Sequence, residues 1–228
     1  SGDDYTAMVV LEWRAPRILM AVLLGTCLAL SGAIFQNLTG NPLGSPDVIG
    51  FQTGSYTGAL VVMLLLGGGS AATMVGALTG GVATAFVVFF LSSKRGAVRG
   101  VRLIIVGIAV SAMLASVNVW ILLTATVEDA IMAGLWGAGN LSGVSWPTFA
   151  TAFAGSALFI VAAAALSRPM RIMQIGMPFA TALGQNVRLV QVSAIVIGVG
   201  LTALATATVG PISFIALAAP QIARRIVR

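Results

Sequence analysis

The sequence predicts an all-α protein, a polytopic bundle of transmembrane helices. Three observations carry this prediction: the composition, the spacing of long apolar runs and the distribution of charge between them. Of the 228 residues, 58% are hydrophobic and only 8% are charged, whereas soluble domains have about 25% charged residues. A soluble fold would need a more highly charged surface, so we expect the chain to lie in a bilayer.

Seven apolar runs are candidates for membrane spans, each of which needs about 20 mostly apolar residues. They cover residues 17–37, 50–67, 71–92, 102–124, 147–167, 189–209 and, in a shorter run, 212–226. Pro147, Pro169 and Pro211 lie near span ends, where proline disturbs a helix least. We therefore expect one transmembrane domain over residues 1–228.

Charge divides the spacers between two sides. One side carries Lys94, Arg95, Arg99, Arg102, Arg168, Arg171, Arg188, Arg224, Arg225 and Arg228. The other carries only Arg14 and Arg17, together with Asp3, Asp4, Glu12, Glu128 and Asp129. Because basic residues accumulate in cytoplasmic loops, residues 38–49, 93–101, 168–188 and the C-terminal end are predicted to be cytoplasmic, and residues 1–16 and 125–146 to be outside.

An outside N-terminus, an odd number of spans and a start at Ser1 predict that the chain is a fragment. Within the spans, "GFQTGSYTG" (50–58) and "GALTG" (76–80) place small residues four positions apart. Such spacing favours close helix packing, and a substrate pathway along these glycines is the alternative. The loop "GNPLGSPD" (40–47) predicts a hairpin in which Asp47 caps a helix that starts near Val48.

The sequence offers little for catalysis. Histidine is absent, and the one cysteine, Cys27, lies in an apolar run. No GK[ST] nucleotide motif occurs, and no Lys, Asp or Glu lies at the centre of a span, which disfavours a proton- or sodium-coupled transporter. We therefore expect neither an enzyme nor a metal site. Polar residues of the spans form hydrogen bonds between helices or contact a ligand: Gln36, Asn37, Gln52, Ser111 and Asn118.

A membrane body without an energy source of its own needs partners, and the loops are the candidate contacts. Arg14 and Arg17, in "EWRAPR", either anchor a span at the headgroups beside Trp13 or bind an acidic partner through bidentate pairs. On the other side, residues 168–188 contain apolar residues such as Met170 and Ile175, which favour a packed segment with a short helix over a flexible loop.

The sequence resembles the FecCD family of ABC importer permeases, which serve iron–siderophores, haem and vitamin B12. The resemblance covers nearly the whole chain and rests on "WRAPRILMAVLLGTCLALSGAIFQNLTGNPLGSPDVIGFQTG" (13–54), "RIMQIGMPFATALGQNV" (171–187) and "VGPISFIALAAPQIARR" (209–225). Within the family it is most similar to the ferric enterobactin branch.

The resemblance implies ten helices, of which this chain lacks the first and the last two. It implies a pair of permease subunits bound to two ATPase subunits, which hold ATP and Mg, and a siderophore-binding protein. Arg14 and Arg17 would bind that protein. Residues 169–187 would couple to the ATPase, with contacts from Arg171, Gly176, Ala180, Ala182, Leu183 and Gly184. The helix at 102–124, with Ser111 and Asn118, would line the translocation path.

Three positions depart from the family pattern. Gly40 replaces an arginine, Gln221 replaces a histidine, and Met177 and Pro178 replace an acidic pair after the coupling glycine. The last departure affects the ATPase contact, and none removes Arg14 or Arg17.

The sequence thus predicts a multi-pass permease of the cell (inner or cytoplasmic) membrane that imports a ferric siderophore, of catecholate type by that branch. ATP would be hydrolysed on a separate chain, the second permease would be a different homologous chain, and no nucleic acid would bind. A secondary transporter without an ATPase is the alternative, and an intramembrane enzyme or a non-transporting scaffold are further ones.

Overall fold

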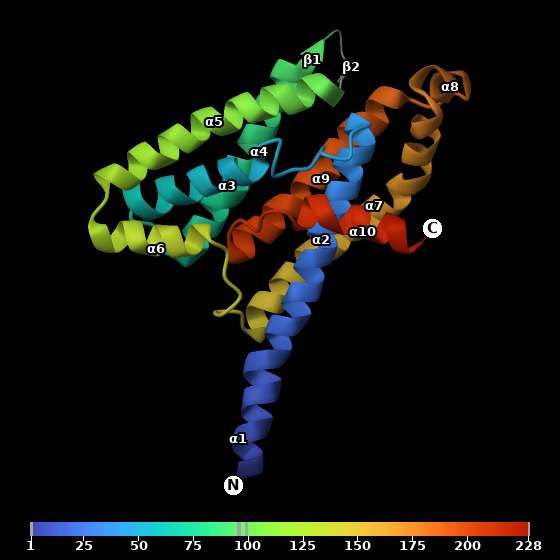
Figure 1. The fold of residues 1–228 in the computed structure, drawn as a ribbon. Helices are drawn as coiled ribbons and strands as arrows, with labels where there is room; N and C mark the ends of the chain where they lie inside the picture. The colour runs from blue at the N-terminus through green and yellow to red at the C-terminus, as the bar shows by residue number, and fades with distance from the viewer. Residues whose placement is uncertain (1, 95–96, 99, 228) are drawn as a thin grey trace.

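The computed structural model describes residues 2–94, 97–98 and 100–227. These residues are mostly helical (Figure 1). The elements follow in the order α1 (Gly2–Met8), η1 (Val9–Arg14), α2 (Ala15–Thr39), α3 (Phe51–Leu60), η2 (Val61–Leu65), α4 (Ser70–Ser92), β1 (Ser93–Lys94), β2 (Ala97–Val98), α5 (Gly100–Thr124), α6 (Val127–Gly137), α7 (Trp146–Ile175), α8 (Met177–Ala182), α9 (Val187–Val209) and α10 (Ile215–Ile226). The predicted helical bundle is confirmed, and a two-residue antiparallel ladder between β1 and β2 is added. Arg95, Arg99 and Arg228 lie outside the described residues.

Five helices of the described chain are long and apolar enough to cross a membrane: Tyr5–Thr39, Ser70–Ser92, Gly100–Thr124, Trp146–Ile175 and Val187–Val209. They contain the predicted spans at 17–37, 71–92, 102–124, 147–167 and 189–209 almost entirely. The first is longer than predicted, because α1 and η1 continue α2 as a rod that projects from the bundle (Figure 1).

Local sequence explains several helix ends. Pro16 and Pro147 occupy the first turns of α2 and α7, where the missing N–H costs nothing. Gly40 ends α2 in the left-handed conformation, at φ 62°. Thr126 starts α6, and its hydroxyl accepts a hydrogen bond from Asp129 N at 3.2 Å. The sequence analysis did not predict α6, since it interpreted residues 125–146 as a loop.

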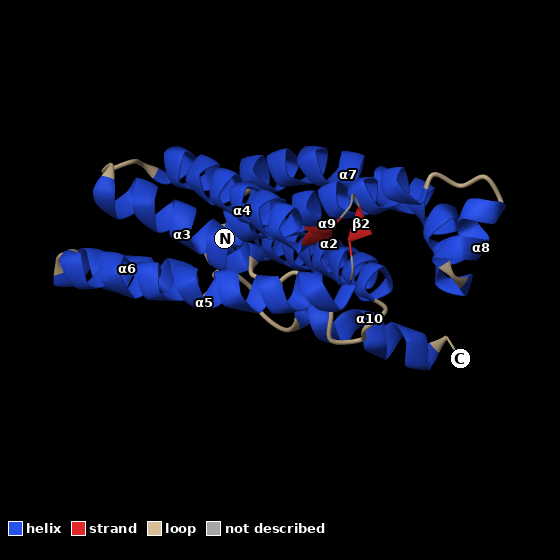
Figure 2. Ribbon diagram, turned by 90° about the horizontal axis from the view of Figure 1, so that it is seen from above, coloured by secondary structure: helices blue, strands red, loops and turns tan. Residues whose placement is uncertain are grey.

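The centre of the bundle is α9, which packs against α2, α4 and α7. Figure 2 shows α2 and α9 between the layer of α4 and α7 and the layer of α5 and α10. The core beside α9 includes Phe35 and Phe51, whose ring centroids are 5.2 Å apart, and both side chains are almost fully buried. Leu201 of α9 is also fully buried.

The glycines of α3 and α4 bring these two helices into backbone contact. A Cβ on Gly58 would lie 2.0 Å from the carbonyl oxygen of Gly76, and one on Gly80 would lie 2.4 Å from that of Gly54. No side chain larger than hydrogen fits at these positions. The structure thus confirms close helix packing at the predicted small-residue pattern.

Two predicted spans are shorter than a bilayer requires. The run at 50–67 becomes α3 and η2, which together cover Phe51–Leu65. The run at 212–226 becomes α10, whose 12 residues extend only about 18 Å. Each follows an irregular segment: Ser45 and Ile49 are fully buried in the first, and the second starts at Gly210, which is buried and has φ 84°. Such backbone is tolerated at membrane depth where protein surrounds it.

The predicted grouping of the spacers is also visible in the structure. One cavity is bordered by residues of the predicted cytoplasmic segments, including Asn41, Gly100, Met173 and Arg224. At the other end, Trp146 Nε1 donates to Leu11 O at 3.0 Å and so joins the two segments predicted to lie outside. The two sets of segments therefore lie at opposite ends of the bundle.

Candidate functional site

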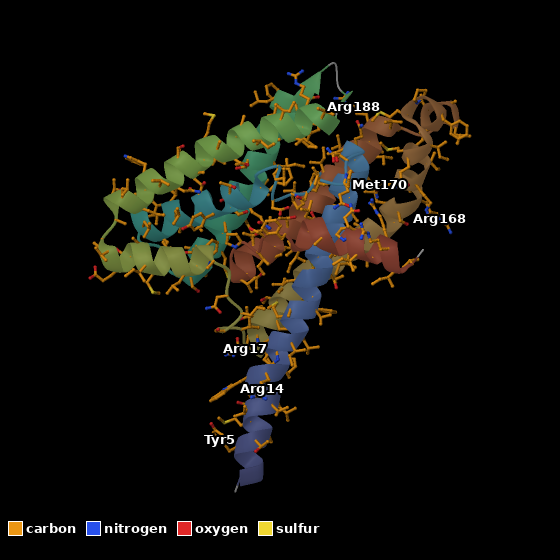
Figure 3. The ribbon with its side chains drawn as sticks, viewed as in Figure 1. Tyr5, Arg14, Arg17, Arg168, Met170 and Arg188 are labelled. Carbon is orange, nitrogen blue, oxygen red and sulfur yellow. The ribbon has the colours of Figure 1, made fainter. Side chains whose placement is uncertain are left out.

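The predicted docking arginines lie where the N-terminal rod meets the bundle (Figure 3). Arg14 is the last residue of η1, and Arg17 lies in the first turn of α2. Both side chains are exposed. The guanidinium of Arg17 donates to the carbonyl oxygen of Ser142, in the loop before α7. This hydrogen bond fixes Arg17, whereas Arg14 has no hydrogen-bond partner among the described residues.

The different surroundings of Arg14 and Arg17 fit a cationic binding site better than two arginines that both anchor the helix at the lipid headgroups. Arg17 has one structural contact, whereas no described residue occupies the five N–H donors of Arg14. The nearby Trp13 is about half exposed. The docking role itself stays a prediction.

The predicted coupling segment consists of a helix end, a break and a short helix. Residues 168–175 continue α7, so the connection predicted at 168–188 starts later than expected. Gly176, with φ 142° and ψ 139°, ends α7, and α8 starts at the next residue. Gly184, at φ 80°, ends the turn after α8. Both glycines adopt conformations that side-chain-bearing residues rarely take.

Hydrogen bonds fix α8 to its neighbours. Gln185 Nε2 donates to Pro169 O at 2.9 Å and its backbone N donates to Ala180 O at 3.0 Å. Asn186 caps α9 by accepting from Leu189 N at 3.1 Å. Gln185 thus joins the turn after α8 to α7, and α9 starts directly after this turn.

The predicted coupling residues differ in exposure. Ala180 is fully buried on the inner face of α8. Ala182 and Gly184 are exposed, and Leu183 is 60% exposed. Phe179, which the sequence analysis did not single out, is 49% exposed on the same short helix. Arg171 lies apart from α8, one turn before the end of α7. Exposed Phe and Leu side chains beyond a span are the signal that would have identified Phe179.

Ser111 and Asn118 lie on the inward face of α5. Asn118 is 5% exposed, and its Oδ1 has no partner among the described atoms; the same is true of Ser111 Oγ. A Cβ on Gly50 would lie 2.1 Å from Ser111 Oγ, so the segment before α3 covers this serine. Their role in a translocation path stays a prediction, and within this chain both face protein.

The loop at 40–47 does not cap the following helix as predicted. The cap of α3 is Gly50, and Asp47 Oδ2 instead accepts from Phe214 N, at the start of α10, at 3.2 Å. The reason is that the fold places the partly buried Asp47 beside the backbone N–H of Phe214, the N-cap of α10, which has no intrahelical partner. Asp47 thus joins the two irregular segments of the bundle.

Glutamines make similar links and confirm the interpretation that polar span residues bind helices together. Gln36 Nε2 donates to Leu217 O at 3.0 Å, and Gln52 Nε2 donates to Ile212 O at 2.9 Å. Gln221, which departs from the family pattern, donates to Gln36 Oε1 at 2.7 Å. These bonds satisfy carbonyl groups at the breaks before and within α10.

A wide crevice of about 1050 Å³ opens between the ends of α2, α7 and α10. Its walls carry polar side chains without a carboxylate, among them Asn37, Asn41, Gln174 and Arg224. Within the described residues, no group of three or more His, Cys, Asp and Glu could hold a metal ion.

Comparisons with known proteins agree with this picture. The model of the FecCD transport family matches residues 1–228. The chain is 50% identical over 219 residues to the ferric enterobactin transport system permease protein FepG of Escherichia coli, and 32% identical over 231 residues to the achromobactin transport system permease protein CbrC of Dickeya dadantii. These matches cover 96% and 100% of this chain but 66% and 65% of the relatives.

The fold has a counterpart among solved structures. The chain superposes with a TM-score of 0.89 and 25% identity on a structure described as an inward-facing conformation of a metal-chelate type ABC transporter. That match covers 100% of this chain and 72% of the solved chain. With the family model matching every residue, the chain belongs to the FecCD transport family.

Proposed function

We propose that the chain is part of the membrane-spanning permease subunit of an ATP-driven ABC importer that moves a ferric siderophore into the cytoplasm. Relatives named as ferric enterobactin and achromobactin permeases support the substrate class, and the enterobactin match favours a catecholate. The membrane is the cytoplasmic, or inner, membrane. The chain is a transport component without catalytic groups of its own.

The observation that carries the proposal is the exposed short helix α8. Phe179 and Leu183 project from it at the end of the bundle, between glycines that fix its orientation. Apolar side chains exposed beyond a membrane span indicate a protein partner. An ATPase subunit that holds ATP and Mg is the partner, and its closure moves α8 together with α7 and α9.

At the opposite end, Arg14 and Arg17 are the contact for a siderophore-binding protein outside the membrane. Carboxylates on that protein would form bidentate pairs with the guanidinium groups. A second, homologous permease chain would supply the other half of the docking surface and of the path. The cargo leaves through the crevice at the α8 end, which has no carboxylate on its walls to repel an anionic chelate.

A secondary transporter is the second candidate. It would need ionisable residues within the spans to bind a coupling ion. Asp47, which precedes the predicted span at 50–67, accepts a hydrogen bond from Phe214 N. The absence of carboxylates at the centres of the spans therefore favours the ATP-driven reading.

Arginine substitutions in the complete transporter test the proposal. Arg14→Glu is the sharper single variant, because Arg14 has no structural hydrogen bond to lose, while Arg17→Glu also breaks the bond to Ser142. We expect the double variant to lower ATP hydrolysis stimulated by the binding protein about tenfold, the loss of at least one charge pair. Arg14→Lys/Arg17→Lys keeps the charge and should retain part of it. Unchanged stimulation and uptake in the double Glu variant would rule out docking at these arginines.

A further inference from the structure

A groove between α2 and α7 has an apolar half and a polar half. Its volume is about 310 Å³. The apolar half is lined by Leu30, Ile34 and Ala163. The polar half, toward α8, is lined by Asn37, Ser167, Arg171 and Gln174. The groove thus has the two-part chemistry of an amphiphile site.

Along α7, the groove extends from the hydrocarbon core of a bilayer into the headgroup region. Ala163 and Arg171 are eight residues apart on one helix, which is about 12 Å along its axis. The 30 residues of α7 extend about 45 Å, whereas the hydrocarbon core is about 30 Å thick. The last turns of α7 therefore reach the headgroup region, and Ala163 stays within the hydrocarbon.

The polar half of the groove offers hydrogen-bond donors. Arg171, Ser167 and Gln174 have no side-chain hydrogen bond among the described residues. Asn37 Oδ1 accepts from the Arg224 guanidinium at 3.3 Å, which leaves the Asn37 amide NH₂ as a donor. A guanidinium surrounded by amide and hydroxyl donors suits a phosphate, whose oxygens only accept.

Charge complementarity selects an anionic occupant. A second cavity of about 500 Å³ shares Arg171 with the groove and adds Arg168, Ile172 and Ile175. The segments predicted to be cytoplasmic contain a single acidic residue, Asp47. Its carboxylate accepts a hydrogen bond from Phe214 N. Among the described residues, the arginines of α7 therefore have no carboxylate to neutralise them.

We propose that the α2–α7 groove binds an anionic phospholipid. One acyl chain lies against Leu30, Ile34 and Ala163, and the phosphate accepts hydrogen bonds from Arg171 at the polar end. An ATPase reaches only the part of the groove outside the membrane and leaves its apolar half empty, so a lipid fits the whole groove. Arg171 then serves the bilayer, and coupling to the ATPase rests on α8. The groove shares Ala33, Asn37 and Gln174 with the crevice proposed as the cargo exit, but the lipid site does not depend on which siderophore is carried.

Native mass spectrometry of the complete transporter, with the full-length permease, tests the charged half. Dioleoylphosphatidylglycerol and dioleoylphosphatidylcholine are titrated as probes. We expect tighter retention of phosphatidylglycerol, and Arg171→Gln to weaken it about fivefold, the effect of one basic residue near an anionic headgroup. The matched control is Arg188→Gln, which removes the same charge from an exposed position at the start of α9, outside the groove (Figure 3).

A second pair of variants tests the apolar half. Ala163→Leu fills the groove and should lower retention of both lipids, whereas Ala164→Leu, on the exposed neighbouring position, should not. Equal retention of the two lipids, or equal effects within either variant pair, overturns the proposal. Release of the ATPase by Arg171→Gln with lipid retention unchanged also overturns it, because Arg171 would then belong to the ATPase contact.

Discussion

Helices α9 and α5 are two apolar spans of similar length that have opposite surroundings. In the most apolar 18-residue window, 61% of α9 is buried but only 17% of α5. The inward face of α5 packs through Gly107 on Ile49, in the segment before α3, while Ile105, Met113 and Trp120 of α5 are exposed. Hydropathy therefore identifies both helices as spans but does not indicate which one lies at the centre of the bundle and which one at its edge.

The two helices differ in burial because they differ in how many neighbouring helices their side chains pack against. Helix α9 meets neighbours around most of its circumference, so its residues are small or shaped to fit: Gly198 packs against the ring of Phe35, at 2.7 Å from a Cβ placed there. Helix α5 meets the described protein on one face and is exposed on the other. Substitutions in α9 should consequently destabilise the protein more than the same substitutions in α5.

The largest effect is expected for Leu201→Ala on α9. Leu201 is fully buried, and truncating a buried leucine to alanine typically costs about 2–5 kcal/mol because a cavity remains. The matched control is Leu123→Ala on α5, where the side chain is 80% exposed and the change should stay within about 0.5 kcal/mol. Unfolding of the purified permease in mixed micelles measures both. Similar losses would show that a neighbour covers α5 at this position.

An intermediate effect is expected for Gly107→Ala, at the tight contact of α5. A Cβ there would lie 2.7 Å from the backbone Cα and O of Ile49, and overpacking of this kind costs about 1–3 kcal/mol. Gly134→Ala on α6, where no atom lies within 4 Å, provides the control and should be neutral or stabilising, because alanine favours a helix. The same unfolding assay distinguishes them, and equal stability would mean that α5 is not held against the loop before α3.

The smallest effect is expected for Ser111→Ala. The hydroxyl is buried without a partner, so its removal should change the free energy of unfolding by less than about 0.5 kcal/mol. Siderophore uptake per folded transporter is the second readout. Lower uptake at unchanged stability would support Ser111 in the translocation path, and unchanged uptake would contradict that role.

Much of the fold could be predicted because its signals are local. Apolar runs determined the five long helices, and the glycine spacing predicted the α3–α4 contact. The charge pattern predicted which segments share an end, as the Arg224–Asn37 and Arg17–Ser142 hydrogen bonds show. Gln36 and Gln52 could be predicted as interhelical contacts, because an amide within a span needs a partner.

Other features depend on distant residues and have no local signal. Asp47 precedes a helix start, which suggests a cap, but its partner is Phe214, 167 residues away. The run at 212–226 was predicted as a short span, but its first residues belong to the irregular segment 210–214, so α10 has only 12 residues. α6 lies in a glycine-rich tract and packs through tertiary contacts, with Trp136 stacked 6.1 Å from Tyr56. Arg171 follows the coupling pattern in sequence but lies on α7, beside the groove.

The central claim is that this membrane body is moved by ATP hydrolysis on another chain. The most direct test is uptake of a ferric siderophore into proteoliposomes that contain the complete transporter and its binding protein, compared with and without ATP. We predict that uptake requires ATP and the ATPase subunits and that ion gradients do not replace them. Uptake by the permease alone, driven by a proton or sodium gradient, would contradict the account.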